Sequence, residues 1–233
     1  MRIPSVWRRC RDSGALHLTG MPRKNLILVL GLMVLLALVV SGARPYDRPT
    51  WLLEVLPVLM AAPVLFLTYR RFPLTTLLYV LICLHALVLI LGGAYTYARV
   101  PLGFWVQDLF DLHRNPYDKI GHFMQGFVPA LIAREIFVRG GYVTGARMVA
   151  FLSVCVALAI SAFYELIEWW VALALGGGAV EFLGTQGDPW DTQSDMFMAL
   201  AGAVVALLTL ARFHDRQIAA LAASLACQDP HGI

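Results

Sequence analysis

Residues 185–211, TQGDPWDTQSDMFMALAGAVVALLTLA, join an acidic segment to an apolar one without a break. The first thirteen residues contain Asp188, Asp191 and Asp195 but no Lys or Arg. The residues that follow are apolar enough for a bilayer, which a helix of about 20 such residues can cross. The stretch therefore predicts a transmembrane helix with acids at its mouth, and it raises the question of what stabilises them.

The composition extends this prediction to the whole chain. Of its 233 residues, 59% are hydrophobic and 14% are charged, and the mean hydropathy is +0.71. Soluble domains carry about 25% charged residues, so we expect an all-α, polytopic membrane protein surrounded by lipid. The net charge of +3 gives no reason to expect nucleic-acid binding. The four cysteines form no CxxC and suggest neither a disulfide framework nor a thiolate metal site.

Six segments are apolar enough to span the membrane: Asn25–Ser41, Trp51–Tyr69, Pro73–Gly92, Ile120–Val138, Arg147–Leu175 and Thr192–Arg212. This divides the chain into a basic tail (1–24), a membrane domain (25–212) and a second tail (213–233). Residues 101–113, PLGFWVQDLFDLH, are too short and acidic to span and predict an interfacial amphipathic helix. Translation can start at Met1 or at Met21, which begins a basic lead of its own. The last span has small residues at helical spacing that let a neighbouring helix approach: Ala199, Gly202, Ala203 and Ala206.

The basic residues orient the spans, because Lys and Arg concentrate in cytoplasmic loops. With both termini in the cytoplasm, the outer side receives five of the 18 basic residues: Arg44, Arg48, Arg99, Arg114 and Lys119. The other thirteen lie on or near the cytoplasmic side, and most acids lie in the outer half. We therefore expect both termini to be cytoplasmic.

The fourth span begins with NPYDKIGHFMQGF, residues 115–127. Asn115 suits a helix N-cap and Pro116 a first helical position, which makes Asp118 an acid in the first turn. His122 lies four residues after Asp118 on the same face, and Gln125 is one turn deeper. The sequence alone leaves two roles open for His122, a contact between helices or a ligand.

The fifth span contains two acids on one helical face. Glu165 and Glu168 are three residues apart in SAFYELIEWW. A charge at the membrane centre costs about 2.5–3.5 kcal/mol, and two neighbouring carboxylates repel each other. They therefore require a cation, a shared proton or a basic partner.

Capping explains two of the three acids before the sixth span. Asp188 suits the N-cap, Pro189 the first helical position, and Asp191 the first turn. Asp195 lies one turn deeper, where no capping role reaches it. We expect Asp195 to face His122, Glu165 and Glu168 across the bundle, because the corresponding ends of these spans meet at the outer face. Three further residues can join this group, as an acid or in salt bridges: Glu54, Arg114 and Lys119.

Three motifs resemble the YjdF-like inner-membrane proteins of bacteria: YDKIGHFMQGFVPALIAREI, FYELIEWW and FLGTQGDPWDTQSDMF followed by ALAGA. The resemblance extends from about residue 51 to residue 212. It implies a location in the inner membrane and no particular reaction.

A weaker resemblance is to VanZ-like proteins, which have a DKxxH element and a later ExxQ…D…G pattern. This resemblance implies a link to the cell envelope and glycopeptide tolerance. The sequence departs from the pattern by having Glu168 in place of the glutamine and no Arg between Trp170 and Asp195. The matching residues are Asp118, Lys119, His122, Glu165, Asp195 and Gly202.

Three hypotheses follow for function. One is a metal-dependent hydrolase or transferase acting on an envelope lipid or lipid-linked phosphate, because carboxylates and a His suit Mg²⁺, Mn²⁺ or Zn²⁺. The others are a proton- or cation-coupled transporter and a structural protein with a polar packing network. In the enzyme hypothesis His122, Glu165, Glu168 and Asp195 are the catalytic residues and metal ligands. Residues expected to orient these ligands or cap helices are Asp118, Gln125, Asp188 and Asp191. The oligomeric state stays open.

Overall fold

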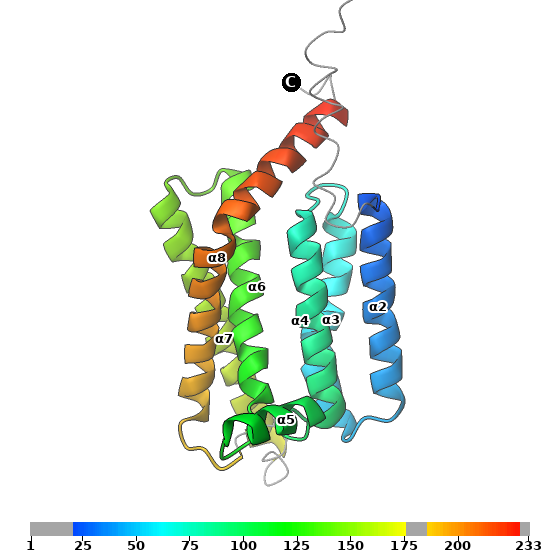
Figure 1. Cartoon of the computed structure of the whole chain (residues 1–233), viewed down its shortest axis with the longest axis vertical. Coiled ribbons are helices and arrows are strands. Elements are labelled where there is room, and N and C mark those ends of the chain that lie inside the picture. The colour runs from blue at the N-terminus through cyan, green and yellow to red at the C-terminus, as the bar shows by residue number, and fades with distance from the viewer. Residues whose placement is uncertain (1–20, 176–185, 229–233) are drawn as a thin grey trace, which may run out of the picture.

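The computed structural model describes residues 21–175 and 186–228. Within these ranges the chain is all-helical, as the composition predicted, with seven helices that form a polytopic membrane bundle (Figure 1). The helices are α2 (Arg23–Ala43), α3 (Arg48–Thr68), α4 (Thr76–Tyr95), α5 (Pro101–Phe110), α6 (Tyr117–Gly140), α7 (Ala146–Leu175) and α8 (Asp191–Gln228).

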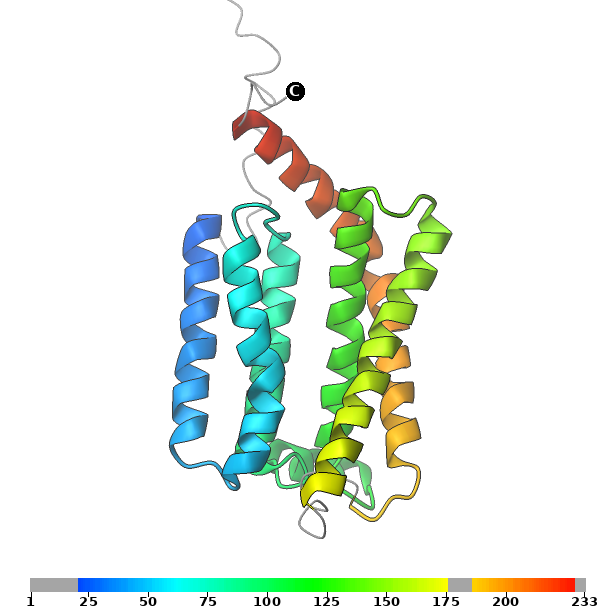
Figure 2. The same ribbon diagram turned by 180° about the vertical axis from the view of Figure 1, so that it is seen from behind.

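The long helices form two groups of three, α2–α4 and α6–α8, which lie side by side (Figures 1 and 2). Helices α4 and α6 make most of the contact between the groups. The short helix α5 lies across one end of the bundle, beside the start of α6. We call this the α5 end; the starts of α3, α6 and α8 lie there, together with the end of α7.

Five of the described helices, α2, α3, α4, α7 and α8, are long and apolar enough to cross a membrane. The sequence predicted six spans, the other being α6. With 24 residues, α6 is about 36 Å long at 1.5 Å per residue, which is enough to cross. It is more polar because it contributes charged side chains to contacts at both ends of the bundle.

Helices α6 and α8 pack backbone against backbone. A Cβ atom on Gly126 would overlap the carbonyl oxygen of Ala199, and one on Gly202 would overlap that of Phe123. Ala199 and Ala203 are fully buried in the same interface. The small residues of the sixth span therefore have the packing role that their spacing predicted, and this close contact fixes the start of α8 against the start of α6.

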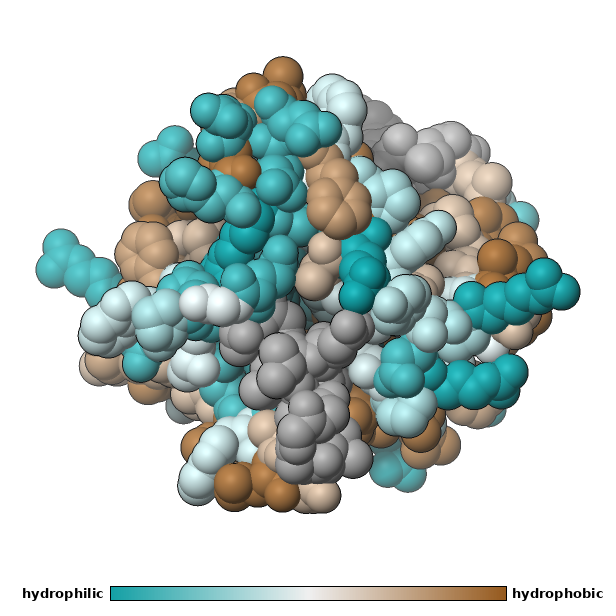
Figure 3. Space-filling view, turned by 90° about the horizontal axis from the view of Figure 1, so that it is seen from below, coloured by the Kyte–Doolittle hydropathy of each residue, from teal (hydrophilic) through white to brown (hydrophobic). Residues whose placement is uncertain are grey.

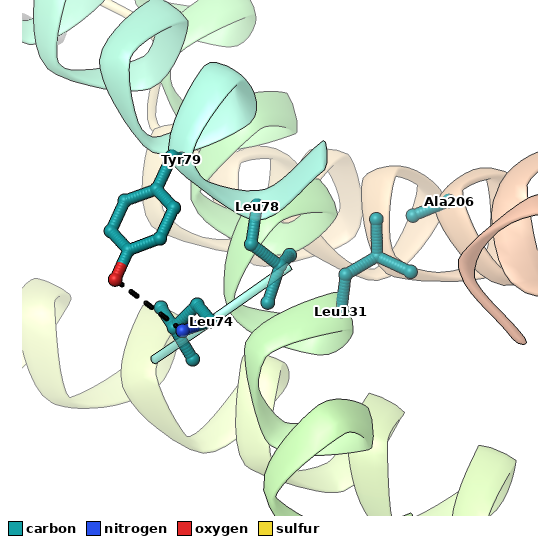
Figure 4. Close-up of a cluster of buried hydrophobic side chains, with 5 residues drawn as sticks. All are labelled: Leu74, Leu78, Tyr79, Leu131 and Ala206. Carbon is teal, nitrogen blue, oxygen red and sulfur yellow. Dashed lines mark hydrogen bonds between the residues drawn. The ribbon is translucent and has the colours of Figure 1, made fainter. Parts of the chain in front are cut away.

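An apolar cluster joins the two groups near the opposite end of the bundle (Figure 4). Leu78 and Leu131 are fully buried within it, one from each group. The Tyr79 hydroxyl accepts a hydrogen bond from the backbone N–H of Leu74 at 3.4 Å, which holds the chain that enters α4. Leu74, Leu78, Tyr79, Leu131 and Ala206 make up the cluster.

Helices α6 and α8 begin slightly later than the sequence predicted. Helix α6 begins at Tyr117 with Pro116 as its N-cap residue, although Asn115 still accepts a hydrogen bond from Tyr117 N at 3.0 Å. Helix α8 begins at Asp191, so Asp191 is in the first turn as expected. Asp188 lies too far ahead to be its N-cap, and instead accepts a hydrogen bond from Trp190 N at 2.9 Å.

Helix α8 also continues beyond residue 212, where the sixth span was expected to end. Its last part tilts away from the bundle (Figure 1). His214 and Gln217 are nevertheless buried, because this part still packs against the other helices.

Candidate functional site

His122 is the centre of the polar group at the α5 end. It is 6% exposed, and its Nδ1 atom lies 3.0 Å from Gln125 Oε1. Because an amide oxygen only accepts, Nδ1–H is the donor. Nε2 faces two carboxylates, at 3.5 Å from Asp118 Oδ1 and 3.9 Å from Asp195 Oδ1. Gln125 thus orients the ring, as the partner of a metal-ligating histidine commonly does.

Asp118, His122 and Asp195 form a group that can hold a metal ion, since one ligand atom from each lies within 4.8 Å of the others. Nitrogen and oxygen ligands bind Zn²⁺ at about 2.0–2.2 Å, so two ligands of one ion are at most about 4.3 Å apart. The two His122–carboxylate distances satisfy this limit. The donor set of two carboxylates and one imidazole also suits Mn²⁺.

Two basic residues stabilise the three acids before and within the start of α8, Asp188, Asp191 and Asp195. Lys119 Nζ lies 2.8 Å from Asp191 Oδ1 and 2.6 Å from Asp195 Oδ1. Arg114 Nη2 lies 2.9 Å from Asp188 and 2.8 Å from Asp191. These ion pairs connect the start of α8 to the start of α6. The bases come from a segment more than 70 residues earlier in the chain, which is why residues 185–211 look unpaired.

The structure places the two acids of α7 in different surroundings. Glu165 is buried. Its Oε1 atom lies 3.8 Å from His122 Nδ1 and has no hydrogen-bond partner. Glu168 lines a cavity between the two helix groups and is not part of the metal-holding group. The structure thus brings His122, Asp195 and Glu165 together, adds Asp118, and places Glu168 on the cavity side.

The cavity between the helix groups has a volume of about 1160 Å³. Its walls are mostly apolar side chains of α2, α3, α4 and α6. At the α5 end it is lined by acidic and aromatic residues as well as by His122: Glu54, Tyr97, Asp118, Tyr164 and Glu168. The site therefore adjoins an apolar space that is larger than the pockets of about 300–1,000 Å³ that hold drug-sized ligands.

Several of these lining residues carried little signal in the sequence. Tyr164 donates a hydrogen bond to Glu54 Oε2 at 3.0 Å, which links α7 to α3. Its place directly before Glu165 is the only indication that the sequence offers. Tyr97 lies in the loop after α4, and burial raises the pKa of its phenol well above the usual range. Tyr97 therefore stays protonated and available as a donor at the cavity wall.

The face of the α5 end is polar. Hydrophilic residues gather across it, and apolar residues lie along parts of its rim (Figure 3). A shallow cavity of about 460 Å³ opens there, with Arg114, Lys119 and Asp188 among its lining residues. The polar group of α6, α7 and α8 is thus next to a charged surface on one side and to the apolar cavity on the other.

Comparison with known proteins supports the membrane assignment. Residues 26–216 match the family described as "Predicted membrane protein (DUF2238)". The chain belongs to this family. It is also 63% identical over 187 residues to the inner membrane protein YjdF of Escherichia coli (strain K12), which covers 80% of this chain and 90% of that protein. No solved structure matches the chain.

These similarities confirm the YjdF-like resemblance, whose motifs all fall within the matched family region. They also identify the chain as a multi-pass inner-membrane protein. The roles of the individual site residues remain predictions.

Proposed function

We propose that this protein is a metal-dependent hydrolase or transferase that acts on an envelope lipid or lipid-linked phosphate. One observation carries the proposal: a group of Asp118, His122 and Asp195 that can hold a metal adjoins a mostly apolar cavity of about 1160 Å³. A cavity of this kind accepts a hydrocarbon chain, and its polar end lies beside groups able to bind an ion.

The residues suit phosphoryl chemistry. A divalent ion held by Asp118, His122 and Asp195 would polarise a phosphoryl oxygen and lower the pKa of bound water. Glu165, which has no hydrogen-bond partner on Oε1 and lies 3.8 Å from His122, is placed to accept a proton from that water. Lys119 and Arg114 lie beside this group, where their ion pairs with Asp188, Asp191 and Asp195 offset the charge of these acids.

The site lies at the α5 end, and the basic residues are more numerous at the other end of the bundle. This excess favours a site that faces outward. Under the positive-inside rule both termini are cytoplasmic and the α5 end faces outward. Alkaline phosphatase fused after Gly187 should be active, and the same reporter fused after Gly141 should be inactive. The reverse pattern would place the site on the cytoplasmic side.

Metal content tests the proposal most directly. Purified wild-type protein should bind about one Mn²⁺ or Zn²⁺, measured by elemental analysis and titration calorimetry, and Asp195→Asn should weaken this binding at least tenfold. Asp108→Asn removes one charge from an exposed position of α5 and is the matched control. Equal metal binding by wild type and Asp195→Asn would refute the proposed ligand set.

Turnover is tested with vesicles of total bacterial polar lipids. Metal-loaded protein should release phosphate or head groups, detected by mass spectrometry, and a chelator should stop the release. Metal binding without any turnover would show a metal-binding protein and would refute the proposed enzymatic activity.

A second function, a proton- or cation-coupled transporter, is favoured by the extent of the cavity. Its lining reaches from Lys24 and Arg70 at one end of the helices to Asp118 and His122 at the other, with His85 as well. A carrier predicts ion flux into liposomes without chemical change of the lipid. A purely structural network predicts neither flux nor turnover.

A further inference from the structure

Two acids at the polar end of the large cavity, Glu54 and Glu168, have no Lys or Arg close to them in the described part of the chain. Glu54 is 4% exposed and accepts one hydrogen bond, from Tyr164. Among the described residues, neither Glu54 nor Glu168 has a Lys or Arg within ion-pair distance. A buried carboxylate without a cation is costly, so such a group stays neutral until a cation reaches it. A positively charged group at this end of the cavity would stabilise the ionised form of these acids.

The basic residues that line the cavity are too far away to balance these acids. Helix α3 ends at Thr68, 14 residues after Glu54, which is about 21 Å along the helix. Arg70 follows that end, and Lys24 is the second residue of α2. Both therefore lie at the opposite end of the cavity from Glu54.

The other side of His122 provides a contrast within the same site. There Asp191 and Asp195 are paired with Lys119 at 2.8 and 2.6 Å. Among the described residues, the acids of α8 are thus paired with Lys119, whereas Glu54 and Glu168 have no such partner. That difference points to a cation that comes with a ligand.

We propose that Glu54 and Glu168 bind the protonated amine of an amphiphile whose hydrocarbon chain lies in the cavity. The apolar walls match the chain by their chemistry, and the carboxylates match the amine by their charge. Tyr97 and Tyr164 line the same end of the cavity and add hydroxyl groups to it. His85, whose buried Nε2 atom has no hydrogen-bond partner, lines the cavity as well and can bond a polar group of the ligand.

This inference rests on the proposed function, for which it names the substrate class. An amphiphile that carries an amine beside its phosphate would have the amine at Glu54 and Glu168. Its phosphate would lie toward Asp118, His122 and Asp195, where a metal ion balances the charge. The cavity acids would then favour amine-bearing lipids over purely anionic ones.

Binding of matched amphiphiles tests the inference separately from catalysis. Dodecylammonium and dodecanol have the same chain and differ in the charge of the head. Each is added at pH 7, with a chelator present so that no metal or turnover is involved, and binding is measured by native mass spectrometry. Wild type should bind dodecylammonium at least tenfold more tightly than dodecanol. Glu54→Gln, which keeps an acceptor for Tyr164, should lose most of this preference and still bind dodecanol as wild type does.

Asp108→Asn controls for loss of a negative charge at the same end of the bundle and should keep the full preference. Methylammonium chloride at equal concentration should not displace dodecylammonium, because it has no chain for the cavity. Equal binding of the two amphiphiles by wild type, or no binding of either, would overturn the inference. Displacement by methylammonium would overturn the role of the cavity. None of these outcomes depends on metal-dependent turnover, so failure of the proposed function is seen separately.

Discussion

Helices α6 and α8 meet at two polar clusters, one at each end of the bundle, and each contains a histidine and at least one buried acid. In the cluster opposite the α5 end, fully buried Glu135 accepts hydrogen bonds from Thr75 N at 3.0 Å, Thr75 Oγ1 at 2.7 Å and Arg139 at 2.7 Å. His214 Nε2 donates to Glu135 at 2.8 Å. Arg134 Nη1 lies 3.4 Å from His214 Nδ1 on the other edge of the ring.

The cluster around His122 is incomplete by comparison. Its distances to Asp118, Glu165 and Asp195 are 3.5–3.9 Å, which is too long for hydrogen bonds. Glu165 Oε1 has no hydrogen-bond partner. The two clusters are about 20 Å apart along α6, since His122 and Glu135 are 13 residues apart. A structural network satisfies its polar atoms, so the difference supports a structural role for Glu135 and agrees with the binding role proposed for His122.

The largest effect is expected from Glu135→Ala. The change leaves the Thr75 N–H, the His214 N–H and the Arg139 guanidinium buried without their acceptor, which costs about 3–5 kcal/mol. Thermal unfolding in detergent should show a large fall in Tm or loss of folded protein. Ile136→Ala changes the next residue, which is exposed, and is the control. Wild-type stability of Glu135→Ala would mean that this cluster is no more structural than the other.

A smaller loss is expected where the two helices touch between the clusters. Gly202→Ala places a methyl group against the carbonyl oxygen of Phe123, and overpacking of this kind costs about 1–3 kcal/mol. The shift should also separate Asp195 from His122 and weaken metal binding. Gly31→Ala is the matched control, because nothing lies within 4 Å of the added atom. If both variants unfold at the same temperature, close packing of α6 on α8 does not position the site.

Glu165→Gln should stabilise the fold, whereas Glu135→Ala should destabilise it. Replacing a buried carboxyl whose Oε1 atom has no hydrogen-bond partner by a neutral amide should raise the free energy of unfolding by about 1 kcal/mol, while metal binding weakens because one negative charge close to the proposed ligand His122 is lost. Unfolding curves and metal titrations on the same preparation measure both. A clear loss of stability with unchanged metal binding would show that Glu165 belongs to a packing network.

The sequence predicted more of the fold than of the site. Hydropathy predicted six spans, of which five are described helices long and apolar enough to cross a membrane, and the spacing of Ala199, Gly202 and Ala203 predicted the close contact of α8 with α6. Spacing within one helix also placed Asp118 beside His122. It did not determine the side to which each α7 acid points, because that depends on how α7 is rotated against its neighbours.

Contacts between distant segments left still less trace in the sequence. Glu135 and His214 are separated by 79 residues, and nothing in either segment indicates the other. Lys119 and Arg114 were recognised as nearby bases, but their pairing with Asp191 depends on the α6–α8 contact. The side-chain pairs between helices were therefore visible only in the structure.

The smallest effect is expected at the surface of the site, from Asp188→Asn. The variant loses the ion pair with Arg114, 2.9 Å long, but Arg114 keeps its contact with Asp191 at 2.8 Å. An Asn side chain also retains an oxygen that accepts from Trp190 N, so the turn before α8 is preserved. Because the Asp188 side chain is 31% exposed, the lost pair is worth at most about 1 kcal/mol. The difference from wild type in thermal unfolding should shrink further in 0.5 M salt, which screens exposed pairs. A loss as large as that of Glu135→Ala, and insensitive to salt, would mean that the Arg114–Asp188–Asp191 group holds α8 in place as firmly as the buried cluster does at the other end.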